Sequence, residues 1–158
     1  MYVRGILIFF LGFIFITLIG VGFSVEAFAQ FIDPAGAFMF LIVIVAVIIS
    51  QGEFKAFVKA MNALLSKKYH LLAEDREKSI RLFKLIGKSV LYATALIFLI
   101  GLSSVLIFIS GTSGQLPLEL AFAVLMNTCI YGLFINMAFI NPAINILEVR
   151  RNMDEKIQ

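Results

Sequence analysis

Residues 123–147 read AVLMNTCIYGLFINMAFINPAINIL, a stretch that is apolar enough to cross a membrane but holds several amides and hydroxyls. These polar side chains are Asn127, Thr128, Tyr131, Asn136, Asn141 and Asn145. Lipid offers no hydrogen-bond partner, so polar groups at this depth are satisfied by another helix or by a wet cavity. The stretch therefore predicts a membrane-spanning helix with protein or water along part of its surface.

The composition of the whole chain indicates an integral membrane protein. Its 158 residues are 61% hydrophobic, whereas a soluble domain is typically about 45–50% apolar. The mean hydropathy of +1.03 agrees with this class. The single cysteine, Cys129, excludes a disulfide within one chain.

The apolar stretches predict four spans, at residues 6–25, 35–50, 89–110 and 118–140, and the last continues to residue 147. The first is about 30 Å of uncharged helix, which matches the hydrocarbon thickness of a bilayer. Open strands cannot exist in lipid, so all four spans should be helical. We therefore expect an all-α integral membrane protein, a single domain over residues 1–158. It should have four transmembrane helices with short cytoplasmic helical extensions.

An alternative for the first span is a signal peptide. Arg4, the apolar stretch after it and the sequence AFAQ at residues 27–30 resemble a signal peptide with its cleavage site. The apolar stretch is about twenty residues long, whereas about 7–15 are usual in signal peptides. We therefore expect a retained helix.

The basic residues predict the orientation of the chain. All thirteen Lys and Arg residues precede the first span, follow the last span, or lie between the second and the third. The two other loops carry only the acids Glu26, Asp33 and Glu119. The positive-inside rule then places both termini and residues 52–88 in the cytoplasm. The net charge of +3 thus reflects topology and does not indicate nucleic-acid binding.

Residues 52–88 should form two helices. Apolar residues recur at helical spacing over 54–65, which predicts an amphipathic helix that either extends the second span or lies along the membrane interface. Further on, Glu74–Lys78 and Glu77–Arg81 are i,i+4 pairs in the favourable order. They predict a charged helix that leads into the third span.

A helical wheel of residues 123–147 gathers most of the polar groups on one face. That face holds Asn127, Tyr131, Asn141, Asn145, Ala123 and Ala138. Thr128 lies toward its edge, whereas Asn136 and Cys129 point away from it. Two interpretations stay open: the polar groups join helices, at about 0.6 kcal/mol each, or they line a passage or hold a partner helix. Pro142 should bend or end the helix, and Asn141 could satisfy the backbone groups that Pro142 frees.

The chemistry that the sequence lacks is informative. No nucleotide loop, metal-ligand spacing or catalytic constellation is visible, so we expect neither an enzyme nor a cofactor. His70 has no Cys or His nearby in sequence, and no metal site is expected. The apolar interiors of the four spans contain no Asp, Glu, Lys, Arg or His, and Glu119 lies only at the outer edge of the fourth. A self-contained proton carrier needs an intramembrane ionisable group. If this chain moves ions, another subunit should supply the carboxylate.

The order of motifs resembles one known family. Residues 121–148 resemble the last transmembrane helix of MotA-like proteins in the MotA/TolQ/ExbB proton channel superfamily. The matching positions are Ala121, Ala123, Thr128, Ile130, Tyr131, Gly132, Asn136, Pro142, Ala143 and Ile144. Asp33 and Pro34 are similar to the opening of the family's second span, and Leu99-Ile100-Gly101-Leu102 to part of its third. Four spans with both termini inside also fit MotA better than the three-span TolQ and ExbB.

The resemblance implies a scaffold subunit of an ion-driven rotary motor or channel in the bacterial inner membrane. Five copies would surround the transmembrane helices of a single-span, MotB- or ExbD-like partner, and an intramembrane Asp of the partner would carry the ion. On this basis Thr128, Asn127, Tyr131 and Asn136 are candidates to face the partner or the ion path.

Two departures from the family pattern refine this expectation. Ile97-Phe98 replaces the usual Gly-Thr pair of the third span, which favours protons over sodium. Ser103, Ser104 or Thr94 could supply the missing hydroxyl. The cytoplasmic segment is far shorter than the family's rotor-binding domain, so flagellar rotation is not expected. The alternatives are a structural four-helix membrane scaffold without ion transport, and a small secondary transporter, which would require inverted repeats that are not visible.

Overall fold

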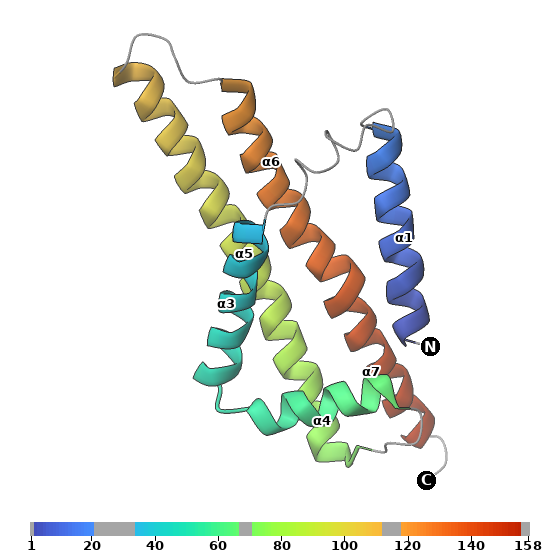
Figure 1. Ribbon diagram of the computed structural model, residues 1–158. Coiled ribbons are helices and arrows are strands. Elements are labelled where there is room, and N and C mark those ends of the chain that lie inside the picture. The colour runs from blue at the N-terminus through green and yellow to red at the C-terminus, as the bar shows by residue number, and fades with distance from the viewer. Residues whose placement is uncertain (1, 21–33, 67–70, 112–117, 156–158) are drawn as a thin grey trace.

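The computed structural model describes residues 2–20, 34–66, 71–111 and 118–155, and within these ranges the regular structure is entirely helical (Figure 1). The elements are α1 (Tyr2–Gly20), α3 (Pro34–Ser50), α4 (Phe54–Leu65), α5 (Ala73–Gly111), α6 (Leu118–Ile135), the π-helix η1 (Asn136–Ile140) and α7 (Asn141–Glu155). The prediction of an all-α fold is confirmed for these residues.

Three helical segments are long and apolar enough to cross a membrane. They are Tyr2–Ile19, Ala73–Ile107 and Leu125–Asn152. The 17-residue α3 is about 25 Å long, and it becomes a fourth candidate span only together with α4, after a bend of 118°. The described residues thus contain three or four helices suited to spanning, as a membrane protein requires.

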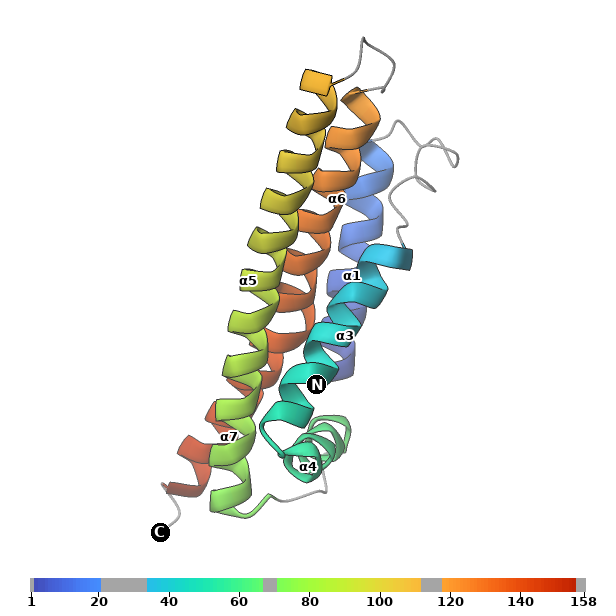
Figure 2. The ribbon, with the colours of Figure 1, turned by 90° about the vertical axis from the view of Figure 1, so that its left-hand side faces the viewer.

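A long antiparallel helical hairpin forms the centre of the fold. Helix α5 has 39 residues, or about 58 Å, and α6, η1 and α7 run back along it as one rod (Figures 1 and 2). Helix α3 packs against α5 and α6, whereas α1 packs against η1 and α7. The two shorter helices thus flank the hairpin, and each lies mainly against a different arm of it.

Helix α4 lies across one end of the bundle (Figure 1). The turn that leads into it depends on Gly52, whose φ of +65° is in the left-handed region that favours glycine. Small side chains then let α4 approach α5 closely, with Ala56, Ala60 and Ala63 buried. We call this end, formed by α4, the first turns of α5, and α7, the basic end. All described Lys and Arg residues other than Arg4 belong to these elements.

Ion pairs and hydrogen bonds hold the elements of the basic end together. Lys59 of α4 contacts Asp75 of α5 at 2.7 Å, and Lys84 of α5 contacts Glu148 of α7 at 2.7 Å. Arg150 Nη1 donates to the Ala63 carbonyl at 2.8 Å, in the last turn of α4, where helix carbonyls lack intrahelical partners. The first and third of these contacts hold α4 against α5 and α7, and the second joins α5 to α7.

One of the two expected i,i+4 ion pairs has a different partner. Lys78 Nζ lies 2.6 Å from Glu74 Oε1, as predicted. Glu77, however, contacts Arg151 of α7 at 3.1 Å, where the sequence predicted Arg81. The packing of α7 against the first turns of α5 brings in a partner that is 74 residues away, and sequence spacing cannot reveal such a partner.

The observed helix bounds extend the predicted spans. Helix α1 begins at Tyr2, four residues before the expected start, with the exposed Arg4 in its first turn. A long basic side chain at a helix end can reach the interface, so it does not stop the helix. Residues 21–25 of the predicted first span lie outside the described residues. The charged helix before the third span and the span itself form one element, α5.

Pro142 does not end the last helix, contrary to one expectation. Its ring has no N–H and collides with the carbonyl four residues earlier in a regular α-helix. The chain instead widens into η1 just before it, with the Asn141 N–H bonded to the Asn136 carbonyl, and then continues to Glu155. Tyr2 of α1 donates its hydroxyl to the Phe139 carbonyl in this wide turn at 3.0 Å. A neighbouring helix thus adds a donor to the backbone of η1, at Phe139 and not at the carbonyl four residues before Pro142.

Candidate functional site

Two of the predicted site residues of the last span, Thr128 and Asn136, lie along its contact with α5. We define the α5–α6 seam as Gly87, Thr94 and Gly101 of α5 with Leu125, Thr128, Gly132 and Asn136 opposite them. The three α5 residues recur every seven positions, the spacing by which two helices stay in contact as they cross at a shallow angle. Small residues at such positions let the backbones approach closely.

The closest approach in the seam is between Gly132 and Thr94. A Cβ atom added at Gly132 would overlap Thr94 Oγ1 and would lie 2.9 Å from Thr94 Cβ and 3.0 Å from Cγ2. The Thr94 hydroxyl donates to the Val90 carbonyl at 2.8 Å and is therefore satisfied inside its own helix. Gly132 is thus required by close packing against a β-branched residue, whose Cβ cannot move without its helix.

Asn136 makes the polar contact of the seam. Its side chain is 7% exposed, and its Nδ2 donates to the Gly87 carbonyl at 3.1 Å. A Cβ atom at Gly87 would lie 3.0 Å from Asn136 Oδ1, so a side chain there would press on the amide. The wheel placed Asn136 away from the polar face, yet its amide donates to the backbone of α5.

The seam lies on a different side of α6 from the expected polar face. Thr128 is 6% exposed, one turn before Gly132 and on the same side of the helix. Asn127 and Tyr131, the centre of the expected face, are half-buried, and Tyr131 packs against a cluster that contains Phe40 of α3 together with Ile86 and Val90 of α5. The helix therefore directs its small residues to the close contact with α5, and its Tyr131 side to the cluster that α3 and α5 form together.

The π-helix explains why the expected face does not continue. A regular α-helix turns by about 100° per residue, whereas an i→i+5 turn rotates less. Residues after η1 are consequently out of phase with those before it. Asn141 and Asn145, which the wheel aligned with Asn127, are exposed on α7.

The remaining candidates divide into exposed and structural positions. Ser103 and Ser104 are exposed on α5 and donate to the carbonyls of Leu99 and Ile100 at 2.8 and 2.9 Å. Pro34 is exposed and begins α3, a position at which the fixed φ of proline fits the helix and its missing N–H leaves no helical bond unmade. Asp33 lies outside the described residues. The structure thus brings together Thr94, Thr128, Gly132 and Asn136 and leaves the two serines on the outer surface.

Three contributors to this region, Gly87, Leu125 and Tyr2, were not among the sequence candidates. The repeat of Gly87, Thr94 and Gly101 at intervals of seven could have indicated the seam, because small residues at this spacing are typical of helix contacts in membranes. No local signal could have paired Tyr2 with Phe139, which lies 137 residues away.

No metal centre is built from the described residues, since no group of three or more His, Cys, Asp or Glu side chains is close enough to hold an ion. The buried polar groups of the seam are hydroxyls and an amide. These can join helices or contact a passing ion, but they cannot carry a proton by themselves.

Comparison with known proteins identifies no family for this chain. A scan against protein-family models, a search of curated proteins and a search of solved structures each gave no match. The resemblance to MotA-like proteins therefore rests on the residues quoted for it.

Proposed function

We propose that the chain is a scaffold subunit of an ion-driven rotary motor or channel complex in the bacterial inner membrane. In this proposal five copies surround a single-span, MotB- or ExbD-like partner whose intramembrane Asp carries the ion, with protons favoured. Both termini and the basic end lie in the cytoplasm. The complex couples ion flow to mechanical work other than flagellar rotation.

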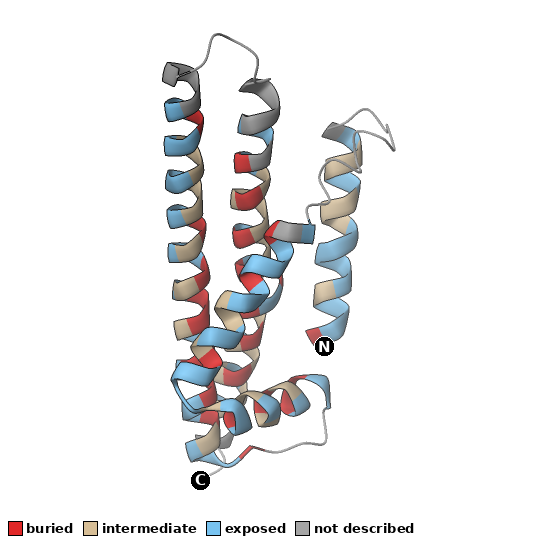
Figure 3. Cartoon of the chain, turned by 60° about the vertical axis from the view of Figure 1, so that its left-hand side comes forward, coloured by how far each residue is buried: buried red, intermediate tan, exposed pale blue. Residues whose placement is uncertain are grey.

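The observation that carries the proposal is the α5–α6 hairpin. Its two arms are long enough to cross a bilayer and extend beyond it, while α1 and α3 only flank it. The outer side of α5 is apolar and exposed (Figure 3), with Tyr92 74% exposed and Leu96 and Leu99 also exposed. In a ring of such hairpins, the neighbouring copies and the central partner would cover the exposed apolar sides.

The absence of a titrating group within the apolar stretches supports a partner. Residues 5–20, 34–50, 89–107 and 122–147 contain no Asp, Glu, Lys, Arg or His. Ion transport then requires a carboxylate from another chain. Ser103 and Ser104 are the candidate hydroxyls that such a chain could reach from outside the hairpin.

A second candidate function is a structural membrane scaffold without ion transport. The observation in its favour is that Thr94 and Asn136 are bonded within the chain and Thr128 is buried in the seam. Each of these groups can be explained as part of helix packing.

The composition of the gently extracted complex, measured by native mass spectrometry, distinguishes the two functions. The motor proposal expects five copies of this chain with a single-span partner that carries a membrane Asp. A monomer or small homo-oligomer without such a partner would leave the scaffold as the function.

A substitution at Thr128 tests the ion path directly. Thr128→Val keeps the shape of the side chain and removes its hydroxyl, and we expect proton flux through the reconstituted complex to fall about tenfold. A tenfold fall corresponds to the loss of roughly 1.4 kcal/mol, the stabilisation that a hydrogen bond from the hydroxyl would give to the passing ion. Flux into vesicles is followed with a pH-sensitive dye. The matched control is Thr17→Val in α1, where the hydroxyl only donates to the Phe13 carbonyl of its own helix. Equal flux in both variants would remove Thr128 from the path.

A further inference from the structure

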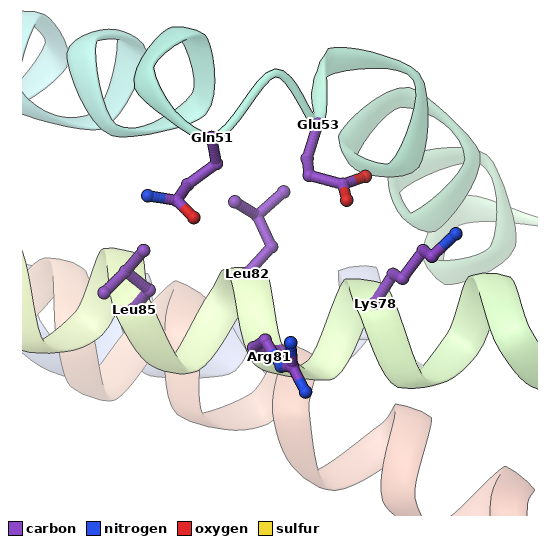
Figure 4. A pocket seen from close by; sticks show the side chains of 6 residues that line it. All are labelled: Gln51, Glu53, Lys78, Arg81, Leu82 and Leu85. Carbon is purple, nitrogen blue, oxygen red and sulfur yellow. The ribbon is translucent and has the colours of Figure 1, made fainter.

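A pocket lies at the elbow between α3 and α4. Its volume is about 380 Å³, and it is lined by Gln51, Glu53, Lys78, Arg81, Leu82 and Leu85 (Figure 4). The first two come from the turn after α3, and the other four come from α5. Figure 4 shows Gln51 and Glu53 on the turn above α5, with Leu82 pointing up between them. We call this cavity the elbow pocket.

The lining combines an apolar floor with a net positive charge. Leu82 and Leu85 are apolar, while Lys78 and Arg81 together outweigh the single carboxylate of Glu53. One hydrogen of the Lys78 ammonium is donated to Glu74, which leaves its two other donors available. Arg81 is exposed and presents a planar fork of donors that matches a phosphate group. This combination suits a phosphate attached to an apolar body.

A second observation places the elbow pocket at the depth of lipid headgroups. Helix α4 buries one face against α5 and carries a second apolar stripe, in which Phe54, Val58 and Leu65 are exposed and Met61 is half-buried against the core. The stripe recurs at intervals of three and four residues, so it follows one side of the helix. Lys55 and Asn62 lie on its remaining, polar side. A helix with such a stripe, bent by 118° from the span-like α3, matches one that lies in the membrane interface.

We propose that the elbow pocket binds the phosphate headgroup of an anionic phospholipid. Arg81 and Lys78 hold the phosphate, Gln51 offers an amide to the headgroup, and Leu82 and Leu85 contact the glycerol region. The lipid then wedges the turn at Gly52 and holds α4 at its angle to α3. This proposal requires only that the chain lies in a membrane, and it does not depend on ion transport.

Lipid binding by the full-length protein tests the proposal. The purified protein is mixed in detergent with equal amounts of phosphatidylglycerol and phosphatidylcholine, and retained lipids are counted by native mass spectrometry. The wild-type protein should retain phosphatidylglycerol preferentially. The double variant Lys78→Gln/Arg81→Gln should lose roughly thirty-fold in this preference, since each basic group near a lipid surface contributes about fivefold.

The matched control is Lys88→Gln, which removes an exposed charge from the same helix outside the pocket. It should keep the wild-type preference. If the double variant fails to fold, judged by helicity and size-exclusion profile, the single variant Arg81→Gln replaces it, because Arg81 makes no ion pair whose loss would destabilise the described structure. An unchanged preference in the pocket variants would overturn the proposal, as would a wild-type protein that retains both lipids equally. Inorganic phosphate that binds with the same dependence on Arg81, while the lipid does not, would assign the site to free phosphate.

The depth of α4 can be measured on its own. The chain has no tryptophan, so Phe54→Trp introduces a single reporter on the open stripe. We expect blue-shifted fluorescence that brominated phospholipids quench when the protein is in vesicles. Lys55→Trp, about 100° around the same helix on its polar side, should emit like a water-exposed indole and resist quenching. Equal quenching of the two would remove α4 from the interface, and with it the reason to place a headgroup in the elbow pocket.

Discussion

Gly132→Ala should destabilise the protein by about 1–3 kcal/mol, the usual range for adding a methyl group to a tightly packed site. The new Cβ would meet Thr94 Oγ1 and would lie 2.9 Å from Thr94 Cβ. Rotation of the Thr94 side chain cannot move its own Cβ, so α5 and α6 must separate. The free energy of unfolding can be measured by titration with sodium dodecyl sulfate in mixed micelles.

Two other glycines provide graded controls for this substitution. Gly12→Ala should leave the free energy of unfolding unchanged or raise it slightly, because a Cβ there meets nothing within 4 Å and alanine favours the helix. Gly101→Ala should fall between the two, since its Cβ would overlap Leu125 Cδ2, the far end of a flexible side chain. If Gly132→Ala is no more destabilising than Gly12→Ala, then α5 and α6 do not approach closely at Gly132.

A double-mutant cycle assigns the effect to the seam. Thr94→Ala removes Oγ1 and Cγ2 but keeps Cβ, so it should relieve part of the conflict created by Gly132→Ala. We expect the double variant to be about 1 kcal/mol more stable than the sum of the single effects, which is typical for residues in direct contact. Strict additivity would show that the two residues do not meet.

Asn136→Asp should destabilise the protein by about 2–3 kcal/mol at neutral pH. The change barely alters the size of the side chain, but an ionised carboxylate cannot donate to the Gly87 carbonyl and would face it with a second acceptor. A buried charge without its hydrogen bond costs more than the bond alone contributes. The same micelle titration measures the loss.

Lowering the pH should reduce the destabilisation that Asn136→Asp causes. A protonated carboxyl group can donate to the Gly87 carbonyl as the amide does, so the deficit should shrink as the pH falls. Asn145→Asp is the control, because Asn145 is exposed on α7 and should tolerate the charge at any pH. A deficit at Asn136 that is small, or that does not respond to pH, would indicate that the amide does not bridge the helices.

Most of the helical architecture could be predicted from the sequence. Composition indicated the membrane class, and the apolar stretches located α3, α5 and α6 to within a few residues or inside longer helices. The clustering of charge between the second and third spans anticipated the basic end. The Glu74–Lys78 pair followed from helical spacing alone. Each of these properties depends on residues that are near one another in the chain.

The choice of contacting faces could not be predicted in the same way. In a soluble protein the apolar side of a helix marks the core, but in lipid both the inner and the outer sides of a span are apolar. The wheel therefore used the polar residues as its guide and selected the Asn127–Tyr131 side. The structure turns Thr128, Gly132 and Asn136 toward α5 because these residues allow the helices to fit closely.

The sequence by itself thus determined a helical chain with several stretches long and apolar enough to span a membrane, and with its positive charge gathered between and beyond them. These features follow from length, hydropathy and charge along the chain. Only the tertiary structure decided the seam, the wide turn before Pro142 with its bond from Tyr2, and the elbow pocket. Each depends on the rotation of one helix about its axis relative to another. That rotation is set by steric fit between residues distant in sequence, and one wide turn is enough to change it.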